Sequence, residues 1–167
     1  FVLDRAGVTG DDGPSHNGIW DLALTGIVPT LQVAAPRDGA RVKETLREAM
    51  QVEDAPTLIR FPKGAVVADI PAFERRDGVD VLYRGESADV LLVSIGAMAH
   101  MAVEAASQAY REGVGVTVID PRWVKPLPES LITMAQRYKS VVVLEDGIRH
   151  GGIASTVSEM FRDAGLQ

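Results

Sequence analysis

"VLLVSIG" (90–96), "VGVTVID" (114–120) and "VVVLED" (141–146) decide the fold of this chain. Each is a near-continuous apolar run, and the three follow one another at intervals of about 25 residues, the length of a strand, a helix and their links. Uninterrupted apolar runs of this length are typical of strands that helices cover on both faces. They predict an α/β half built on a mainly parallel sheet with right-handed crossovers.

The segments between these runs have helical periodicity. In 97–113, one apolar stripe is followed by Gly113, which is expected to end the helix, and 128–139 predicts a second, shorter helix. A third helix is expected at about 152–164. The stripe consists of Ala99, Ala102, Val103, Ala106, Ala109 and Tyr110.

The first part of the chain predicts further strands and helices. Phe1 to Asp4 has the pattern of a buried strand, and a long Gly/Asp loop then extends to about Gly18. A short apolar helix is expected over 19–25. "LQVAAP" (31–36) predicts a strand that ends at a proline.

The next helix has a clear start signal, because Asp38 can cap its first turn. Val42, Leu46, Ala49 and Met50 fall on one face at helical spacing, so we expect this face to be buried. "TLIRFPKG" (57–64) then predicts a strand that runs into a Pro/Gly turn.

Residues 64–87 differ in character. This segment mixes prolines, charges and short apolar pieces and shows no long helical period, so we expect a linker and one entering strand. The chain starts inside a strand pattern and stops after a helix and a Gly turn. We therefore expect it to be a piece of a longer protein.

The composition excludes several classes of protein. The net charge of −6, with acids and bases interleaved, argues against nucleic acid or an anionic membrane as the main partner. The absence of cysteine removes disulfide scaffolds and thiolate metal sites and suits a reducing cytosol. No apolar run approaches the roughly 18 residues that a membrane span needs. The chain is long enough for one good core or two small ones.

The opening loop, "DRAGVTGDDGPSHNG" (4–18), concentrates the groups that a ligand site needs. It follows a strand, and ligands bind beyond the carboxyl ends of strands in open α/β sheets. Glycines let backbone amides approach a ligand, a histidine such as His16 can move protons near neutral pH, and Arg5 can hold a phosphate with its forked donors.

An ordinary surface loop is the alternative interpretation. Gly and Asp are the residues that loops use in any case. In that interpretation Asp11 and Asp12 make turns, His16 is a surface residue, and Arg5 pairs with Asp4 or Asp21. The residues alone leave both interpretations open.

The order of the motifs favours the first interpretation, because it resembles a known family. The chain is similar to the 1-deoxy-D-xylulose-5-phosphate synthases, which belong to the thiamine-diphosphate superfamily, and the likeness covers nearly all of it. The motifs are "DRAGVTGDDGPSHNGIWDLALTGIVP" (4–29), "AAPRDGARVKETLREAM" (34–50), "DAPTLIRFPKG" (54–64), "VIDPRWVKPLP" (118–128) and "EDGIRHGG" (145–152).

The resemblance implies a division into domains. Residues 1–65 correspond to the second half of a parallel-sheet pyrimidine-binding domain, 66–79 to a linker, and 80–167 to a transketolase C-terminal-like α/β domain that is truncated at its end. It also implies that the metal motif and the glutamate that activates the cofactor lie upstream of Phe1.

The resemblance further implies a reaction. A cytoplasmic, homodimeric transferase with thiamine diphosphate and Mg²⁺ condenses pyruvate with D-glyceraldehyde 3-phosphate and releases CO₂. The product, 1-deoxy-D-xylulose 5-phosphate, opens the non-mevalonate isoprenoid pathway and feeds thiamine synthesis. Because most cofactor ligands belong to the upstream part, the isolated chain is expected to be inactive.

Four residues match functional positions of the family. His16 corresponds to the loop histidine over the reactive ring, and Asp12 to the aspartate near the bound substrate; both are expected to be catalytic. Arg5 corresponds to the arginine on the acceptor's phosphate. Lys63 stands where the family has a second basic residue at that phosphate, and a lysine there gives a point charge instead of a fork. No metal ligand is expected in this chain.

Other residues and functions stay open. His100 is expected at the surface, and Arg149 and His150 in a solvated loop, with an approach to an interface or substrate channel as the alternative. For the function, the alternatives are a non-catalytic dimerisation or regulatory module, another transketolase-like enzyme, or a β-type subunit of a 2-oxoacid dehydrogenase.

Overall fold

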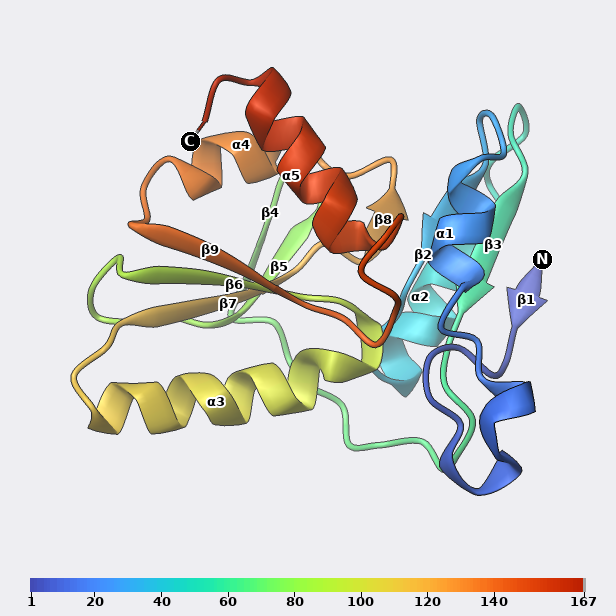
Figure 1. Ribbon diagram of the computed structural model, residues 1–167, viewed down its shortest axis with the longest axis horizontal. Coiled ribbons are helices and arrows are strands. Elements are labelled where there is room, and N and C mark those ends of the chain that lie inside the picture. The colour runs from blue at the N-terminus through green and yellow to red at the C-terminus, as the bar shows by residue number, and fades with distance from the viewer. Residues whose placement is uncertain (167) are drawn as a thin grey trace.

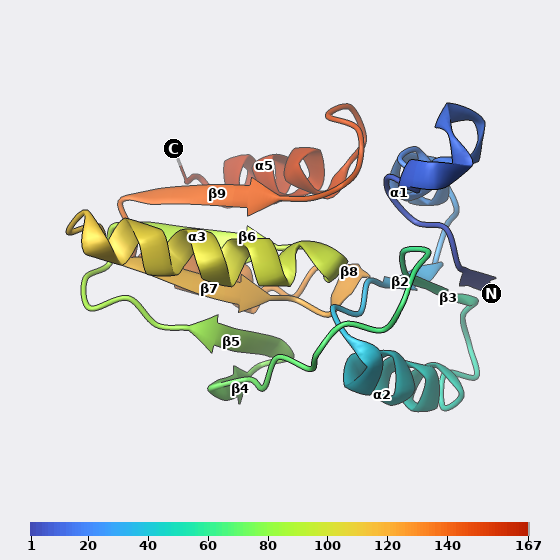
Figure 2. The same ribbon diagram turned by 90° about the horizontal axis from the view of Figure 1, so that it is seen from below.

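The computed structural model describes residues 1–166 and arranges them around two sheets (Figures 1 and 2). The smaller sheet has the strand order β1-β3-β2-β8. Strands β1, β3 and β2 are parallel, and β8 joins β2 in antiparallel orientation. The bounds are β1 Val2–Leu3, β2 Gln32–Ala34, β3 Thr57–Arg60 and β8 Trp123–Lys125.

The larger sheet has the order β4-β5-β7-β6-β9. Its β7, β6 and β9 are parallel, as the three apolar runs predict, whereas β5 and β4 extend it as antiparallel strands. The bounds are β4 Glu74–Arg76, β5 Val79–Tyr83, β6 Val90–Ser94, β7 Val116–Asp120 and β9 Ser140–Leu144.

Helices cover both faces of the larger sheet (Figure 1). The alanines of α3 pack with Leu92 and Val118, while α4 and α5 pack with Leu91 and Val93 on the opposite face. This two-sided burial explains why the strands are apolar throughout. The helices are α1 Asp21–Gly26, α2 Gly39–Ala49, α3 Ala99–Arg111, α4 Ser130–Ala135 and α5 Ile153–Asp163.

Several local predictions are confirmed. Asp38 caps α2, because its carboxylate accepts a hydrogen bond from the backbone N–H of Arg41 at 2.8 Å. Gly113 follows α3 with φ of +77°, the left-handed conformation that glycine adopts without strain. Ala99, Ala102 and Ala106 of the predicted stripe are buried.

The joint between the two sheets is made by strand β8. It lies in the second half of the chain, yet it pairs with β2 of the first half, with Trp123 opposite Ala34. The backbone N–H of Ala35 also donates to the carbonyl of Arg122 at 2.9 Å. One hydrophobic cluster contains side chains of both halves, so the halves share a core.

A buried charge cluster lies at the same joint. The guanidinium of Arg37, which follows β2, donates to the carboxylates of Asp80 on β5 and Asp120 on β7, both at 2.7 Å. All three side chains are at most 1% exposed. Burial raises the pKa of Asp120 to about 6, although Arg37 opposes this. Burial also acts to raise the pKa of Asp80, but hydrogen bonds from Arg75 and Arg37 outweigh it and lower that pKa.

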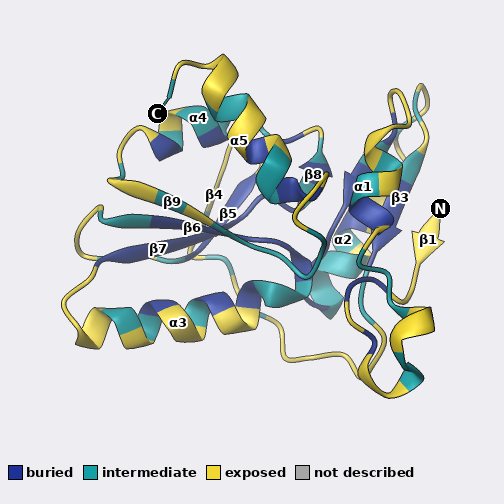
Figure 3. Cartoon of the chain, in the orientation of Figure 1, coloured by how far each residue is buried: buried dark blue, intermediate teal, exposed yellow. Residues whose placement is uncertain are grey.

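Two predictions about burial are wrong. Strand β1 is exposed instead of buried, because it lies at the edge of the smaller sheet and nothing in the described chain covers it (Figure 3). On α2, the predicted apolar face is buried only at Ala49: Leu46 is 46% and Met50, which follows the helix, 79% exposed. The buried side carries Thr45 and Ala49, flanked by charged residues that bind Arg75 and Arg122.

The segment 64–87 holds two strands, not one. Strands β4 and β5 form a hairpin around Asp77 and Gly78, which have φ of +48° and +85°. The Asp-Gly pair is a strong hairpin signal in its own right, so the sequence contained the information for this turn.

Candidate functional site

The loop between β1 and α1 folds back so that its two ends meet. The N–H of Gly18 donates to the carbonyl of Gly7 at 2.8 Å. Deeper in the loop, the side-chain oxygen of Asn17 accepts from both the N–H and the hydroxyl of Thr9, at 2.9 and 3.0 Å. These contacts make a compact Ω-like loop whose own side chains fix its shape.

Two short 3₁₀ turns form the tip of this loop, Gly10–Asp12 and Pro14–His16. They are joined by Gly13, whose φ of +76° is a left-handed conformation that favours glycine. The double turn brings His16 back to Asp12: the ring Nδ1 lies 3.0 Å from the Asp12 carbonyl oxygen.

Asp12 is the centre of the site. Its Oδ1 accepts a hydrogen bond from the ammonium group of Lys63, which follows β3, and its Oδ2 lies 3.7 Å from Nε of Arg5. The hydrogen bond from Lys63 lowers the pKa of Asp12; the charges of Lys63, Arg5 and His16 act in the same direction, against a smaller opposing effect of burial. The carboxylate is therefore ionised at neutral pH and holds two cations.

The sequence-predicted residues thus lie together. Arg5, Asp12 and His16 come from one loop and Lys63 from another, and all four meet in the structure. The alternative partners of Arg5, Asp4 and Asp21, are not the ones it contacts. Asp21 instead binds Arg60.

The two cations remain accessible to solvent. The side chain of Arg5 is 48% exposed and that of Lys63 is 44% exposed, whereas that of Asp12 is only 19% exposed. Two cations that share one carboxylate carry a surplus positive charge, and Arg presents a fork of donors that fits a phosphate. The arrangement can therefore bind a phosphorylated small molecule.

The ring of His16 is held in a form suited to proton transfer. A carbonyl oxygen only accepts hydrogen bonds, so a hydrogen bond from Nδ1 to the Asp12 carbonyl leaves Nε2 as the nitrogen that can exchange a proton with a substrate. The imidazole is exposed, and Ser15 Oγ also lies 3.2 Å from Nδ1. His16 can act as a general base toward a bound substrate.

The remaining candidate residues lie outside this cluster. Asp11 and His100 are exposed, and the ring of His100 lies 3.0 Å from the Ala68 carbonyl oxygen. Arg149 and His150 are exposed as well, in the loop between β9 and α5. This agrees with their interpretation as solvated residues.

An ion triad beneath the loop was not predicted from the sequence. Arg60 ends β3, is buried, and donates to Asp21 at 2.7 Å and to Asp146 at 3.1 Å. The signal was present, because an arginine inside the apolar run "TLIRF" (57–61) requires a buried anionic partner. Its partners are 39 and 86 residues away, and spacing along the chain does not show them.

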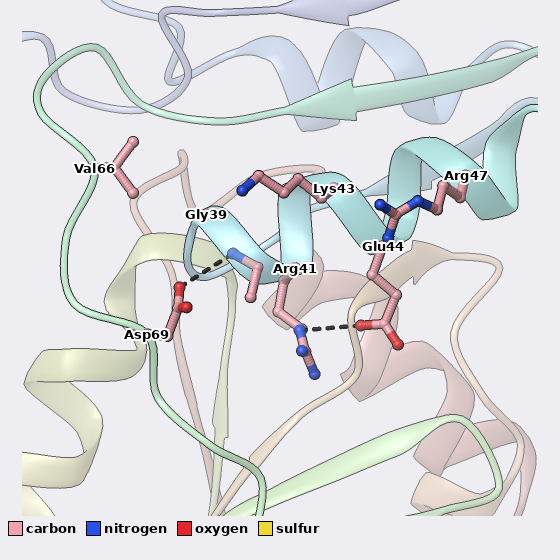
Figure 4. Close-up of a pocket in the computed structure, with 8 residues that line it drawn as sticks. Gly39, Arg41, Lys43, Glu44, Arg47, Val66 and Asp69 are labelled. Carbon is pink, nitrogen blue, oxygen red and sulfur yellow. Dashed lines mark hydrogen bonds and ion pairs between the residues drawn. The ribbon is translucent and has the colours of Figure 1, made fainter.

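A cavity of about 480 Å³ lies elsewhere, between α2 and the segment around Val66 and Asp69 (Figure 4). One ion pair and one hydrogen bond join residues of its lining. Asp69 accepts from the N–H of Ala40 at 3.1 Å, and Arg41 pairs with Glu44 at 3.0 Å. None of the four clustered residues lines it, and we do not assign it a ligand.

The described residues do not form a metal centre. Within 1–166, no three His, Cys, Asp or Glu side chains converge as ligands for a cation. In the same range, no helix has the length and apolar character needed to cross a bilayer.

Comparisons with known proteins show the family and the fold. Residues 1–67 match the transketolase pyrimidine-binding domain, and 80–167 match the transketolase C-terminal domain. A solved structure titled as a split-gene transketolase, an inactive β4 tetramer, covers 97% of this chain and 52% of its own, with 30% identity and a TM-score of 0.81. The transketolase of Campylobacter jejuni, at 16% identity, shares the fold over 96% of this chain and 28% of its own, with a TM-score of 0.66.

Curated relatives are more similar in sequence. The 1-deoxy-D-xylulose-5-phosphate synthases of Mycolicibacterium gilvum and Leifsonia xyli are 57% and 55% identical over 98% and 99% of the chain. That of Mycolicibacterium vanbaalenii is 59% identical over 96% of the chain. The chain spans about a quarter of these relatives, 26% of each. The resemblance to these synthases is confirmed, and the chain belongs to the transketolase family.

Proposed function

We propose that this chain supplies the acceptor-binding and proton-transfer part of a 1-deoxy-D-xylulose-5-phosphate synthase. The observation that carries the proposal is the meeting of Arg5, Asp12 and Lys63 from two separate loops. In the reaction, pyruvate loses CO₂, its two remaining carbons join the aldehyde carbon of D-glyceraldehyde 3-phosphate, and one proton is taken up. Thiamine diphosphate is the cofactor that membership in the family implies, and it supplies the reactive carbanion when bound.

The residues of the chain divide this work between them. Arg5 and Lys63 bind the phosphate of the aldehyde, and Asp12 holds both cations in place before the substrate arrives. The basic Nε2 of His16 accepts or returns a proton at the oxygen on which charge develops. Binding and proton transfer thus depend on different side chains, so their variants should have different kinetic effects.

Kinetics of the full-length enzyme that carries this sequence test the assignment. Arg5→Ala removes a forked phosphate contact and should raise KM for D-glyceraldehyde 3-phosphate by roughly 10- to 100-fold, with a smaller change in kcat. His16→Ala should lower kcat by roughly 100-fold or more. The matched controls are Arg149→Ala and His150→Ala, exposed residues of the same types outside the cluster.

The controls decide how the result is interpreted. If Arg5→Ala and His16→Ala behave like Arg149→Ala and His150→Ala, the cluster is a surface loop and the proposal is wrong. If both variants reduce activity but KM for the phosphorylated aldehyde is unchanged, the cluster is catalytic without being the phosphate site.

We also propose that the chain alone is inactive and that copies of it associate. Support comes from the split-gene transketolase whose title describes an inactive β4 tetramer, because this chain shares its fold over 97% of its length. The homodimer, Mg²⁺ and cytoplasmic location implied by the resemblance remain predictions. Light scattering of the purified chain, together with an assay for 1-deoxy-D-xylulose 5-phosphate, tests both statements.

A further inference from the structure

The partly buried carboxylate of Asp146 contacts both segments that carry the phosphate-binding cations. Asp146 follows β9 in the second half of the chain, and its side chain is 10% exposed. Its Oδ1 accepts a hydrogen bond from Arg60 at 3.1 Å. Arg60 stands three residues before Lys63 in the sequence.

The other oxygen of Asp146 lies against the opening loop. A Cβ built on Gly7 would fall 1.8 Å from Asp146 Oδ2, well inside contact distance, so only a glycine leaves room for the carboxylate here. Gly7 stands two residues after Arg5 and accepts the hydrogen bond from Gly18 that closes the loop. The two carboxylate oxygens therefore face two different loops.

Hydrogen bonds tie down the loop between β9 and α5 in which Asp146 lies. Its neighbour Glu145 accepts hydrogen bonds from the N–H groups of Ile153 and Ala154, at 3.0 and 2.8 Å, which satisfies the start of α5. The N–H of Ile148 donates to the carbonyl of Ile19 at 3.1 Å. These hydrogen bonds hold the loop that carries Asp146 against the start of α5 and against Ile19.

From these contacts we propose that Asp146 is a positioning residue that sets the distance between Arg5 and Lys63. It acts through Gly7 on one side and Arg60 on the other, and so tunes recognition of the phosphate on the acceptor. The inference rests on the proposed function of the cluster, and it gives the second half of the chain a role in substrate selection.

The first test uses the 167-residue chain and inorganic phosphate. Amide chemical shifts of 5–18 are followed while phosphate is added to the native chain, Asp146→Asn and Glu48→Gln. Glu48 is the matched control, because it also links the halves, through the indole N–H of Trp123 at 2.7 Å, but lies outside the loop. Asp146→Asn should weaken phosphate binding about tenfold, the effect of one lost charge-assisted contact, and Glu48→Gln should not.

Hydrogen exchange separates positioning from general weakening of the joint. Asp146→Asn should speed exchange of the hydrogen-bonded amides of Thr9 and Gly18, while the amides of the larger sheet keep their native rates. Glu48→Gln should leave the loop amides unchanged. Equal exchange of the loop in the native chain and Asp146→Asn would overturn the inference, whether or not phosphate binds.

The second test uses the full-length enzyme and two acceptors. Asp146→Asn should raise KM for D-glyceraldehyde 3-phosphate but not for unphosphorylated glyceraldehyde, and KM for pyruvate should stay the same. Equal changes for both aldehydes would exclude a role in phosphate recognition. If Arg5→Ala leaves phosphate binding intact, the proposed function itself is wrong. If Arg5→Ala abolishes phosphate binding but Asp146→Asn does not weaken phosphate binding, only the positioning role of Asp146 is wrong.

Discussion

Lys63 donates a hydrogen bond to the carboxylate of Asp12, a residue 51 positions earlier in the chain, and Arg5 approaches the other oxygen of that carboxylate. Asp12 therefore occupies the position between two cations that a phosphate would have to share. The carboxylate orders the cations and, at the same time, competes with the phosphate for them.

Asp12→Asn should consequently increase the affinity of the 167-residue chain for inorganic phosphate. The neutral amide keeps the size of the side chain but frees both cations, and we expect a gain of about three- to tenfold at low salt. Chemical-shift titration or calorimetry measures it. Asp11→Asn, at the adjacent exposed carboxylate, is the control and should have a smaller effect. Weaker phosphate binding by Asp12→Asn would mean that ordering the cations matters more than competition.

The elements that the sequence predicts well are those that local physics determines. The apolar runs that become β6, β7 and β9, the Asp38 cap and the glycine after α3 depend on neighbouring residues and on burial from both faces. The resemblance predicts which residues form the cluster around Asp12, because it assigns Arg5 and Lys63 to one ligand. It does not predict that both cations contact Asp12.

The features that the sequence did not reveal depend on distant partners. Leu46 of α2 and Met50 just after it are exposed, whereas Glu44 and Glu48, one turn or less away, bind Arg75 and Arg122 from later in the chain. An amphipathic pattern shows which residues share a face, but long-range ion pairs decide which face points inward. Arg60 poses the same problem, since no local pattern identifies Asp146.

Arg37→Met should strongly destabilise the fold. The substitution keeps an apolar stem of similar size but leaves Asp80 and Asp120 as buried carboxylates without their shared cation. Removing one partner from a buried ion pair costs about 3–5 kcal/mol, and urea unfolding at pH 7 measures it. Lys139→Met is the control: Lys139 is 80% exposed and pairs with Asp89, so about 1 kcal/mol or less is expected. Equal losses of stability in Arg37→Met and Lys139→Met would show that burial does not make the ion pairs of Arg37 contribute more than an exposed pair.

The raised pKa of Asp120 predicts a pH-dependent difference between the native chain and Asp120→Asn. This pKa is about 6 in the folded chain and 3.8 for an ordinary aspartate. Between these two pH values, the folded state therefore still binds a proton that the unfolded state has released. The resulting stabilisation is present below pH 4 and disappears as the pH rises through about 6. Asp80 has a lowered pKa, so its opposite contribution changes below this window.

Asp120→Asn has no such proton to lose. As the pH rises from 4 to 7, the free energy of unfolding of Asp120→Asn should therefore increase relative to that of the native chain by up to about 3 kcal/mol. This figure follows from about 1.4 kcal/mol for each unit of pKa shift. Urea unfolding of both proteins at these two pH values tests this. Parallel pH profiles would show that Arg37 keeps Asp120 ionised throughout.

Gly7→Ala tests the close approach of Asp146 to the opening loop. Gly7 and Gly10 both have left-handed backbones, with φ of +69° and +61°, so alanine carries a similar conformational cost of about 1 kcal/mol at each. Only at Gly7 would the new Cβ collide with a carboxylate, since nothing lies within 4 Å of the Cβ position at Gly10. Gly7→Ala should therefore lose more stability than Gly10→Ala and should also weaken phosphate binding, because displacing Asp146 moves Arg60 and the segment that leads to Lys63. Equal losses of stability in Gly7→Ala and Gly10→Ala would mean that the Asp146 side chain moves away from the new methyl group at little cost. The loop itself would then set the spacing of the two cations.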